Sequence, residues 1–564
     1  MSPAGQPAGA ATPGTARSGA ILGRVHPMPR EGRRWEEAAE GVGWLDGRIC
    51  AVGGREQVLA WAQEHAVPVQ DVRDAFVLPG FVDAHMHFLS VGLKRSRPHL
   101  EAARTLEDAL ALVEAWLREH PGPDPVVAEG WDESEWPGRA RPTRRLLDTI
   151  AARLGQPDRP VVLRRVCGHI AVANSAALGP IVSRWPDPSR TDRDSGLLRE
   201  EPSLYLNEAF PASDAQLDAA LQYATREAHR LGVTTVGDYS QAPYRAAILR
   251  AAASGTLGVR IASSFYVQQL AQELEAGFRT GRRRGPWLRD AGMKVFLDGS
   301  LGGRTAALRE PYLDAPPGTP SDCPERRSRH GCVGHPHVRG TLNWGDEDVR
   351  RLFLQAHVAG VQLHAHAIGD AAIDQGLEAF RALEQAAPGP GADALMAAER
   401  QTEAGAGGVA RLRHRFEHFE VAHEDQVRET ARLGVVASCQ PNFVGVWSSK
   451  GGMYEERMGT RYAVNNRFQT FRRLGVRVAF GSDGMPFGPV EGIRAAMHHP
   501  IEEERMGFLQ AVWHYTAMAA WSLHWEDDVG TLAVGHAADL VVVSPRLEVL
   551  QTVQDGVTVH RLQD

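Results

Sequence analysis

The chain has 564 residues, of which 43% are hydrophobic and 23% are charged, a composition typical of a folded globular protein. Its formal net charge of -7 provides no overall basic field for nucleic acid or an anionic membrane, and no run of about 18 apolar residues predicts a transmembrane helix. We therefore expect neither a nucleic-acid nor a membrane partner.

The first residues, 1–18, are rich in Ala, Gly and Pro and predict a disordered tail. They lack the apolar segment of a secretory signal. The five cysteines are few, scattered and odd in number: Cys50, Cys167, Cys323, Cys332 and Cys439. Together these features favour reduced thiols and a cytoplasmic location.

Both ends of the chain consist of short apolar runs separated by turn residues. The pairs Asp46-Gly47 and Asp555-Gly556 lie between apolar flanks, which is typical of β-hairpins. Neither end has enough strands to close a core alone. We therefore predict that residues 19–78 and 525–564 form one small composite β-sandwich.

The central residues, 79–524, alternate strand-like runs with helical stretches, which predicts an α/β fold, a (β/α)8 TIM barrel. The gap between the first and second strands is too long for one crossover, so we assign about 94–206 to an inserted subdomain. Flexible surface insertions are expected at about 314–340 and 386–410. The eight predicted barrel strands are 80–87, 234–239, a run from 261, 293–299, 361–369, a run from 413, 435–441 and 476–483.

The strongest chemical signal is LPGFVDAHMH at 78–87. Side chains alternate along a strand, so His85 and His87 point to the same side, toward the barrel interior. They lie at the carboxyl end of their strand, where barrel active sites are built. Two imidazoles at this spacing suit a divalent ion such as zinc.

Similar residues end three later strands. His366 and His418 each follow an apolar run, and Asp483 ends the run AFGSD. Each could alone be a strand-end hydrogen-bonding residue, but their shared position favours a common metal site. His364 competes with His366, because both face the same way.

Lys294 lies near the start of its predicted strand. A buried lysine has a lowered pKa and a reactive amine, which can add carbon dioxide to form an anionic carbamate. The residues alone equally permit an interior ion pair with Asp298 or Glu310.

Together with KVFLDGSLGGRTAAL, HAIGDAAID, EHFEVAHED and FGSDGMPF, these motifs resemble the amidohydrolase superfamily, in particular the branch that includes N-substituted formamide deformylases. The resemblance covers nearly the whole chain after the tail. It implies a barrel hydrolase with a small β-sandwich made by both termini. It also favours His366 over His364, since the family motif ends His-Ala-Ile-Gly-Asp.

The resemblance implies a binuclear centre, expected to hold two zinc ions. His85 and His87 would bind the first ion, and His366 and His418 the second. Carbamylated Lys294 would bridge both ions, and Asp483 would contact the first ion and the attacking water.

The expected reaction is hydrolysis of an amide-type C–N bond, such as an N-acyl or N-formyl bond, by a metal-bridging hydroxide with Asp483 as general acid and base. A mononuclear, deaminase-like hydrolase and a non-catalytic scaffold are the alternatives. The substrate would be a small molecule, and relatives suggest a homodimer. Candidate substrate contacts, which could instead be packing residues, are Trp131, Asp132, His169 and Arg304.

Overall fold

The computed structural model divides the chain into two compact units, Met1–Phe88 with Thr225–Asp564, and Leu89–Ala224. It describes residues 17–29, 37–95, 97–133, 136–166, 170–188, 190–199, 201–204, 206–321, 328–334, 337–384, 386 and 408–562. Most of the predicted tail and most of the predicted 386–410 insertion therefore lie outside the described residues.

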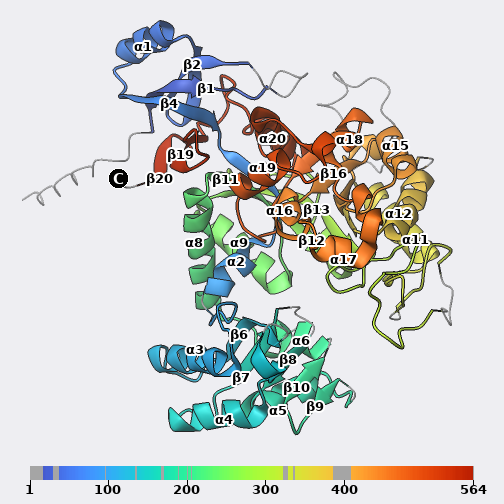
Figure 1. The fold of residues 1–564 in the computed structure, drawn as a ribbon. Helices are drawn as coiled ribbons and strands as arrows, with labels where there is room; N and C mark the ends of the chain where they lie inside the picture. The colour runs from blue at the N-terminus through green and yellow to red at the C-terminus, as the bar shows by residue number, and fades with distance from the viewer. Residues whose placement is uncertain are drawn as a thin grey trace, which may run out of the picture. The chain divides into compact units, whose positions relative to one another are not determined.

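One seven-stranded sheet in the first unit combines both ends of the chain (Figure 1). Residues at the centres of both predicted hairpin turns have positive φ, 47° and 79° at Asp46-Gly47 and 51° and 81° at Asp555-Gly556, as type I′ turns require. Both hairpins are thus confirmed. In sheet order the strands are β20 (Val557–Arg561), β19 (Val549–Gln554), β18 (Leu540–Val543), β4 (Val69–Pro79), β1 (Gly19–Val25), β2 (Ala39–Leu45) and β3 (Arg48–Gly53).

Alternate residues of β1 face opposite sides of this sheet. Ala20 and Leu22 pack against helix α1 (Arg55–Glu64), while Ile21 and Val25 join a larger apolar cluster on the other side. The larger cluster also contains Leu540, Val542 and Val553 from the C-terminal end, so burial of this shared core explains why the two ends of the chain fold as one body.

The centre of the first unit is an eight-stranded parallel sheet, so the predicted barrel fold is confirmed. Each barrel strand pairs with the next barrel strand in chain order. The strands are β5 (Phe81–Met86), β11 (Val233–Tyr239), β12 (Arg260–Tyr266), β13 (Leu288–Phe296), β14 (Gln362–Ala367), β15 (Arg415–His418), β16 (Val436–Cys439) and β17 (Val478–Phe480).

Side chains and backbone together join β17 to β5, the first and last members of that strand order. The carboxylate of Asp83 is fully buried and accepts the backbone N–H of Ser482 at 2.9 Å and its hydroxyl at 2.5 Å. The N–H of Asp483 donates to the carbonyl of His85 at 2.8 Å. This join brings the end of the His-x-His strand beside Asp483.

Helices of the first unit follow the barrel strands, as the alternating sequence pattern predicts. They are α2 (Phe88–Arg95, shared with the second unit), α8 (Asp214–Arg230, also shared), α9 (Ala242–Ala253), α10 (Leu270–Glu275), α11 (Asp346–Val358), α12 (Asp370–Leu383), α14 (Gly408–Arg411), α15 (Glu424–Leu433), α16 (Pro441–Trp447), α17 (Met453–Met458), α18 (Phe468–Arg473), α19 (Pro489–Met497), α20 (Phe508–His514) and α21 (Ala517–Ser522).

The second unit contains its own sheet, in the order β6-β7-β8-β10-β9, and two apolar clusters. Val126 and Ala128 belong to the cluster that includes α3 and α4, and Val127 to the cluster that includes α5, so helices cover both faces of β6. Its elements are α3 (Leu106–Glu119), β6 (Val126–Trp131), α4 (Arg144–Arg153), β7 (Val161–Arg165), β8 (Ile170–Ala173), α5 (Ser175–Arg184), β9 (Thr191–Asp192), β10 (Leu197–Arg199), α6 (Glu201–Leu204) and α7 (Leu206–Ala209).

Some local expectations need correction. Arg17, assigned to the tail, pairs with Asp555 at 2.5 Å. Cys332 takes part in a disulfide, so the expectation of five reduced thiols is wrong at this residue. The described part of the 314–340 insertion is held by contacts such as that of His330 with Glu378, 3.0 Å apart. Among the described residues, no helix has the length and apolarity to cross a membrane.

Candidate metal centre

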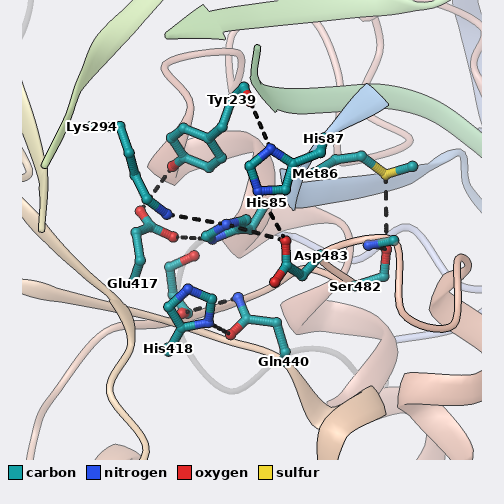
Figure 2. Close-up of polar contacts among 12 residues, drawn as sticks. His85, Met86, His87, Tyr239, Lys294, Glu417, His418, Gln440, Ser482 and Asp483 are labelled. Carbon is teal, nitrogen blue, oxygen red and sulfur yellow. Dashed lines mark hydrogen bonds and ion pairs between the residues drawn. The ribbon is translucent and has the colours of Figure 1, made fainter. Parts of the chain in front are cut away.

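Five strand ends of the barrel bring the six predicted ligands to one place. Figure 2 labels five of them, His85, His87, Lys294, His418 and Asp483. Asp483 Oδ1 lies 3.3 Å from His87 Nε2 and 3.6 Å from His85 Nε2. Lys294 Nζ lies 3.3 Å from His85 Nε2. The rings of His366 and His418 are 4.4 Å apart, and the ring of His418 is 4.8 Å from that of His85. Residues separated by up to 398 positions (Asp483 and His85) thus form one cluster.

Each of the two His-x-His imidazoles has one ring nitrogen engaged by an acceptor. Nδ1 of His85 donates to Glu417 Oε2 at 2.5 Å, and Nδ1 of His87 donates to the backbone carbonyl of Tyr239 at 2.7 Å. Because a carboxylate and a carbonyl only accept, Nδ1 carries the proton in both rings. Their Nε2 atoms therefore present lone pairs toward Asp483.

The other two imidazoles are fixed in the same way. Nδ1 of His418 donates to the side-chain oxygen of Gln440 at 2.8 Å, which leaves its Nε2 as the acceptor. His366 is reversed: its Nε2 donates to the carbonyl of Gly299 at 2.9 Å, so Nδ1 is the acceptor. An outer hydrogen bond of this kind selects the tautomer that a metal ligand needs.

Burial keeps the rings of His85, His366 and His418 neutral. Burial, followed by the positive charge of Lys294, lowers the pKa of His85 to about 4 and that of His366 to about 3. A neutral imidazole is the form that coordinates metal. The cluster is thus prepared for a cation rather than for protons.

Lys294 lies two residues before the end of β13, not near the start of the strand as predicted, because β13 extends back to Leu288. Burial lowers the pKa of its ammonium to about 8, against the opposing effects of Glu417 and Asp483. A pKa closer to neutrality increases the fraction of free amine.

The alternative interior ion pair of Lys294 is wrong. The carboxylate of Asp298 accepts the backbone N–H groups of Ala307, Ile368 and Gly369. Glu310 is mostly exposed, 3.5 Å from Arg461. Both acids therefore have other partners.

His364 lies apart from the candidate ligand atoms. Its Nε2 is 2.9 Å from the side-chain oxygen of Gln362, and its Nδ1 is 3.3 Å from the hydroxyl of Ser264. Both nitrogens are engaged, whereas Nδ1 of His366 has no hydrogen-bond partner among the described residues. The geometry favours His366.

The candidate substrate residues have varied surroundings. Trp131 is fully buried in the core of the second unit and its indole N–H donates to the carbonyl of Leu163 at 3.0 Å, which favours a packing role. Asp132 pairs with Arg165. His169 lies outside the described residues. Arg304 pairs with Asp314 at 2.6 Å.

Sequence reasoning missed the residues that orient the ligands, namely Glu417, Tyr239 and Gln440. Glu417 is fully buried and contacts Arg415 and the hydroxyl of Tyr239 as well as His85. Burial alone would raise its pKa, but the charge of Arg415 holds the pKa of Glu417 well below its usual range. The charged pair Arg415-x-Glu417, directly before the candidate ligand His418, is a signal that could have identified it.

An aromatic ring borders the cluster. Phe296, at the end of β13, is 36% exposed, and its ring centre is 4.9 Å from that of His366 and 5.1 Å from Lys294 Nζ. The ring of Tyr266 stacks against it at 5.9 Å. The site therefore presents an apolar surface beside its polar atoms.

The donor set fits a divalent cation. Donor atoms of His85, His87 and Asp483 all lie within 4.8 Å of one another. Among the described residues, Asp483 Oδ1 and His366 Nδ1 are buried without a hydrogen-bond partner. Buried acceptors without partners are unfavourable unless a cation or a proton donor satisfies them. Imidazole nitrogens with a carboxylate are typical zinc ligands.

Two known proteins are similar to this chain over nearly its whole length. YtcJ of Bacillus subtilis, assigned as an amidohydrolase, is 28% identical over 556 residues, covering 93% of each chain. An N-substituted formamide deformylase of Arthrobacter pascens is 27% identical over 564 residues, covering 91% of this chain and 93% of that protein.

Two solved structures share the fold, both titled uncharacterized metal-dependent hydrolases. The one from Pyrococcus furiosus has a TM-score of 0.72 at 24% identity and covers 94% of this chain and 99% of its own. The one from Pyrococcus horikoshii OT3 has a TM-score of 0.74 at 22% identity, with 97% and 100% covered. The model of the amidohydrolase family matches residues 68–561. Since that match spans most of the sequence, this chain belongs to the amidohydrolase family.

Proposed function

We propose that this protein hydrolyses an amide-type C–N bond, such as an N-acyl or N-formyl bond, in a small molecule. The observation that carries the proposal is the convergence of four imidazoles around Asp483 and Lys294, each with one ring nitrogen fixed by a hydrogen bond to an oxygen acceptor. The names of the two curated relatives support C–N bond chemistry.

In the binuclear form of the proposal, His85 and His87 hold the first ion, and His366 and His418 the second. Lys294, whose free amine could add carbon dioxide with loss of a proton, would as a carbamate supply anionic oxygen ligands to the centre. Divalent ions, expected to be zinc, supply Lewis-acid activation of water and of the substrate carbonyl when bound.

Asp483 acts as the proton carrier. Its Oδ1 has no hydrogen-bond donor among the described residues, so it is available to accept a proton from the attacking water. The same carboxyl then returns the proton to the leaving nitrogen. The N–H of Asp483 is fixed by the carbonyl of His85, which holds the carboxylate over the cluster.

A mononuclear hydrolase is the second candidate. It is favoured by the observation that only His85, His87 and Asp483, among the described residues, form a compact donor set within 4.8 Å. In that case Lys294 stays an amine and supports the site sterically.

Metal analysis and a Lys294→Ala variant test the proposal together. Two equivalents of zinc in the wild type, with loss of one or both in the variant, support the binuclear centre, whereas one equivalent in both proteins supports the mononuclear form. Activity is measured with metal-loaded protein on a panel of formamides, N-acyl amines and cyclic amides. If metal-loaded wild type hydrolyses no compound of the panel, amide hydrolysis is wrong.

A further inference from the structure

One carboxylate, Glu417, contacts several groups that build the first metal position. It lies on β15, directly before His418, and is fully buried. Its Oε2 accepts Nδ1 of His85 at 2.5 Å, and its Oε1 accepts the hydroxyl of Tyr239 at 2.8 Å (Figure 2). The same Oε1 also accepts Nε of Arg415 at 2.5 Å. Each of its oxygens thus has a defined partner.

Tyr239 extends this arrangement to the second imidazole of the His-x-His pair. Its hydroxyl donates to Glu417, and its backbone carbonyl accepts Nδ1 of His87 at 2.7 Å. The hydroxyl of Tyr266 donates to the same carbonyl at 3.1 Å. Glu417 therefore orients His85 directly. It orients His87 indirectly, because it accepts the hydroxyl of Tyr239, whose carbonyl binds His87.

The four candidate imidazoles differ in the charge of their outer partner. His87 and His366 donate to backbone carbonyls and His418 donates to an amide, all of which are neutral acceptors. Only His85, among these four, donates to a carboxylate. A carboxylate behind an imidazole makes the opposite nitrogen a stronger donor to a metal, because it stabilises the positive charge that coordination places on the ring.

Arg415 fixes Glu417 in this role. Its guanidinium contacts both oxygens of Glu417 and also donates to the carbonyl of Ala84 at 2.8 Å and the hydroxyl of Ser438 at 2.9 Å. These contacts join β15 to β5 and β16. A carboxylate paired in this way cannot turn away from His85 without leaving a buried charge unpaired.

We propose that Glu417 is the positioning residue that makes the first metal position tighter than the second. This inference rests on the proposed metal centre and states which of its two positions binds a metal ion more tightly. The position formed by His85 and His87 has a hydrogen bond to a carboxylate, and the position formed by His366 and His418 has hydrogen bonds to neutral acceptors only. The nearest carboxylate to His366, that of Asp298, is 3.7 Å from Nε2 and instead accepts three backbone N–H groups. The second ion is therefore released first when a chelator is added.

The test is a zinc and cobalt titration of chelator-stripped protein, with affinities from chelator competition and from the visible spectrum of bound cobalt. In Glu417→Gln, the tighter equivalent should bind about 10- to 100-fold more weakly than in the wild type, with the weaker one unchanged. The matched variant Gln440→Ala removes the neutral partner of His418 and should weaken only the second equivalent. Near-ultraviolet circular dichroism and the Tm of the metal-free proteins report the fold separately.

Two results would overturn the inference. One is wild-type affinity for the first equivalent in Glu417→Gln. The other is an equal weakening of both equivalents accompanied by a lower Tm of the metal-free variant, which would show a structural role only. A wild type that binds no zinc or cobalt would instead refute the proposed metal centre.

If Glu417→Gln does not fold, Tyr239→Phe decides the question. It removes one hydrogen bond to Glu417 and leaves the contact with His85 intact. The first equivalent should weaken by about two- to tenfold, the usual effect of one hydrogen bond, and an unchanged affinity would count against the inference.

Discussion

The two ends of the barrel both contain clusters of charged and aromatic residues, but the clusters are built differently. At the amino ends of the strands, Arg289 pairs with Asp528 at 2.5 Å and lies 4.1 Å from the centre of the Trp525 ring. Arg413 similarly pairs with Glu526 at 2.5 Å and lies over the ring of Trp521. Each guanidinium there has a carboxylate partner and an aromatic cover.

At the carboxyl ends, acceptor atoms such as Asp483 Oδ1 and His366 Nδ1 are buried and have no hydrogen-bond partner among the described residues. Burying an unsatisfied acceptor costs free energy, so such a cluster persists only where something else satisfies it. Paired charges indicate a structural role, and convergent unpaired acceptors indicate a binding site. The comparison therefore assigns stability to one end of the barrel and chemistry to the other.

Replacing Asp483 should give the largest effect. Asp483→Asn keeps the size of the side chain but cannot carry a proton, so kcat should fall by about 100- to 10,000-fold with metal bound. Steady-state kinetics on a hydrolysed amide, at equal metal content, measure this loss. The Tm should change little, since the atom altered has no hydrogen-bond partner among the described residues. A kcat within tenfold of the wild type would contradict the proton-carrier role.

Replacing Arg289 should have the opposite profile. Arg289→Met removes a buried partner of Asp528, and breaking such a pair costs several kcal/mol. Asp528 retains Arg283 at 2.6 Å, so we expect the lower end of that range, about 3 kcal/mol. Urea denaturation measures the change in the free energy of unfolding. Metal content and kcat per folded molecule should match those of the wild type. A loss of metal would contradict the assignment of stability to the amino ends of the strands and of metal binding to their carboxyl ends.

His514 separates the effect of burial from that of metal binding. It is fully buried, its Nδ1 donates to the carbonyl of Val478 at 2.7 Å, and burial lowers its pKa to about 4 from 6.5. Because the folded state resists protonation, the unfolded chain binds more protons below pH 6.5. The stability is therefore full above pH 6.5 and is lost as the pH falls toward 4, by roughly 3 kcal/mol for this group.

The variant His514→Gln isolates that contribution. Urea midpoints of the metal-free wild type and variant are compared at pH 7.5 and pH 4.5. The variant should lose less stability between these two values than the wild type does. An identical loss in both proteins would mean that His514 is protonated equally in the folded and unfolded states.

Much of the fold could be predicted from local patterns. The period of two in the His-x-His strand placed His85 and His87 on one side, and the Asp-Gly pairs identified both hairpin turns. These predictions depend only on residues that are close together in the sequence, so they require no knowledge of tertiary contacts.

The outer partners of the ligands could not be predicted in this way. On a regular strand Glu417 and His418 would point to opposite sides, but His418 has φ of 73°, which ends the regular strand. Both residues therefore contact the cluster, Glu417 through His85 and His418 through its ring contacts. A left-handed φ at a non-glycine residue is set by tertiary contacts, so the alternation rule fails at this point.

Trp131 shows the same limit for substrate residues. The sequence left it open as a substrate contact or a packing residue, and the indole is fully buried in the second unit. A tryptophan has enough apolar area to serve either as a core residue or as a contact surface, and only the packing around it distinguishes the two.

The aromatic rings at the two ends of the barrel differ in how far they are covered by neighbouring groups. Trp525 and Trp521 are covered by guanidinium groups, but Phe296 stays 36% exposed beside Lys294 and the ring of His366. An exposed phenylalanine next to a catalytic cluster gains free energy if an apolar part of the substrate packs on it.

Phe296→Ala should therefore raise the KM for amides with a large apolar substituent by about tenfold, with little change in kcat, because the lost contact exists in both the ground and the transition state. For unsubstituted formamide the same variant should behave like the wild type, since that substrate is too small to use the ring. The ratio of kcat/KM between the two substrates isolates the contact from any general damage to the site. If both substrates lose kcat/KM equally, Phe296 supports the metal ligands rather than the substrate, and the aromatic surface at this end of the barrel is structural, like the one at the other end.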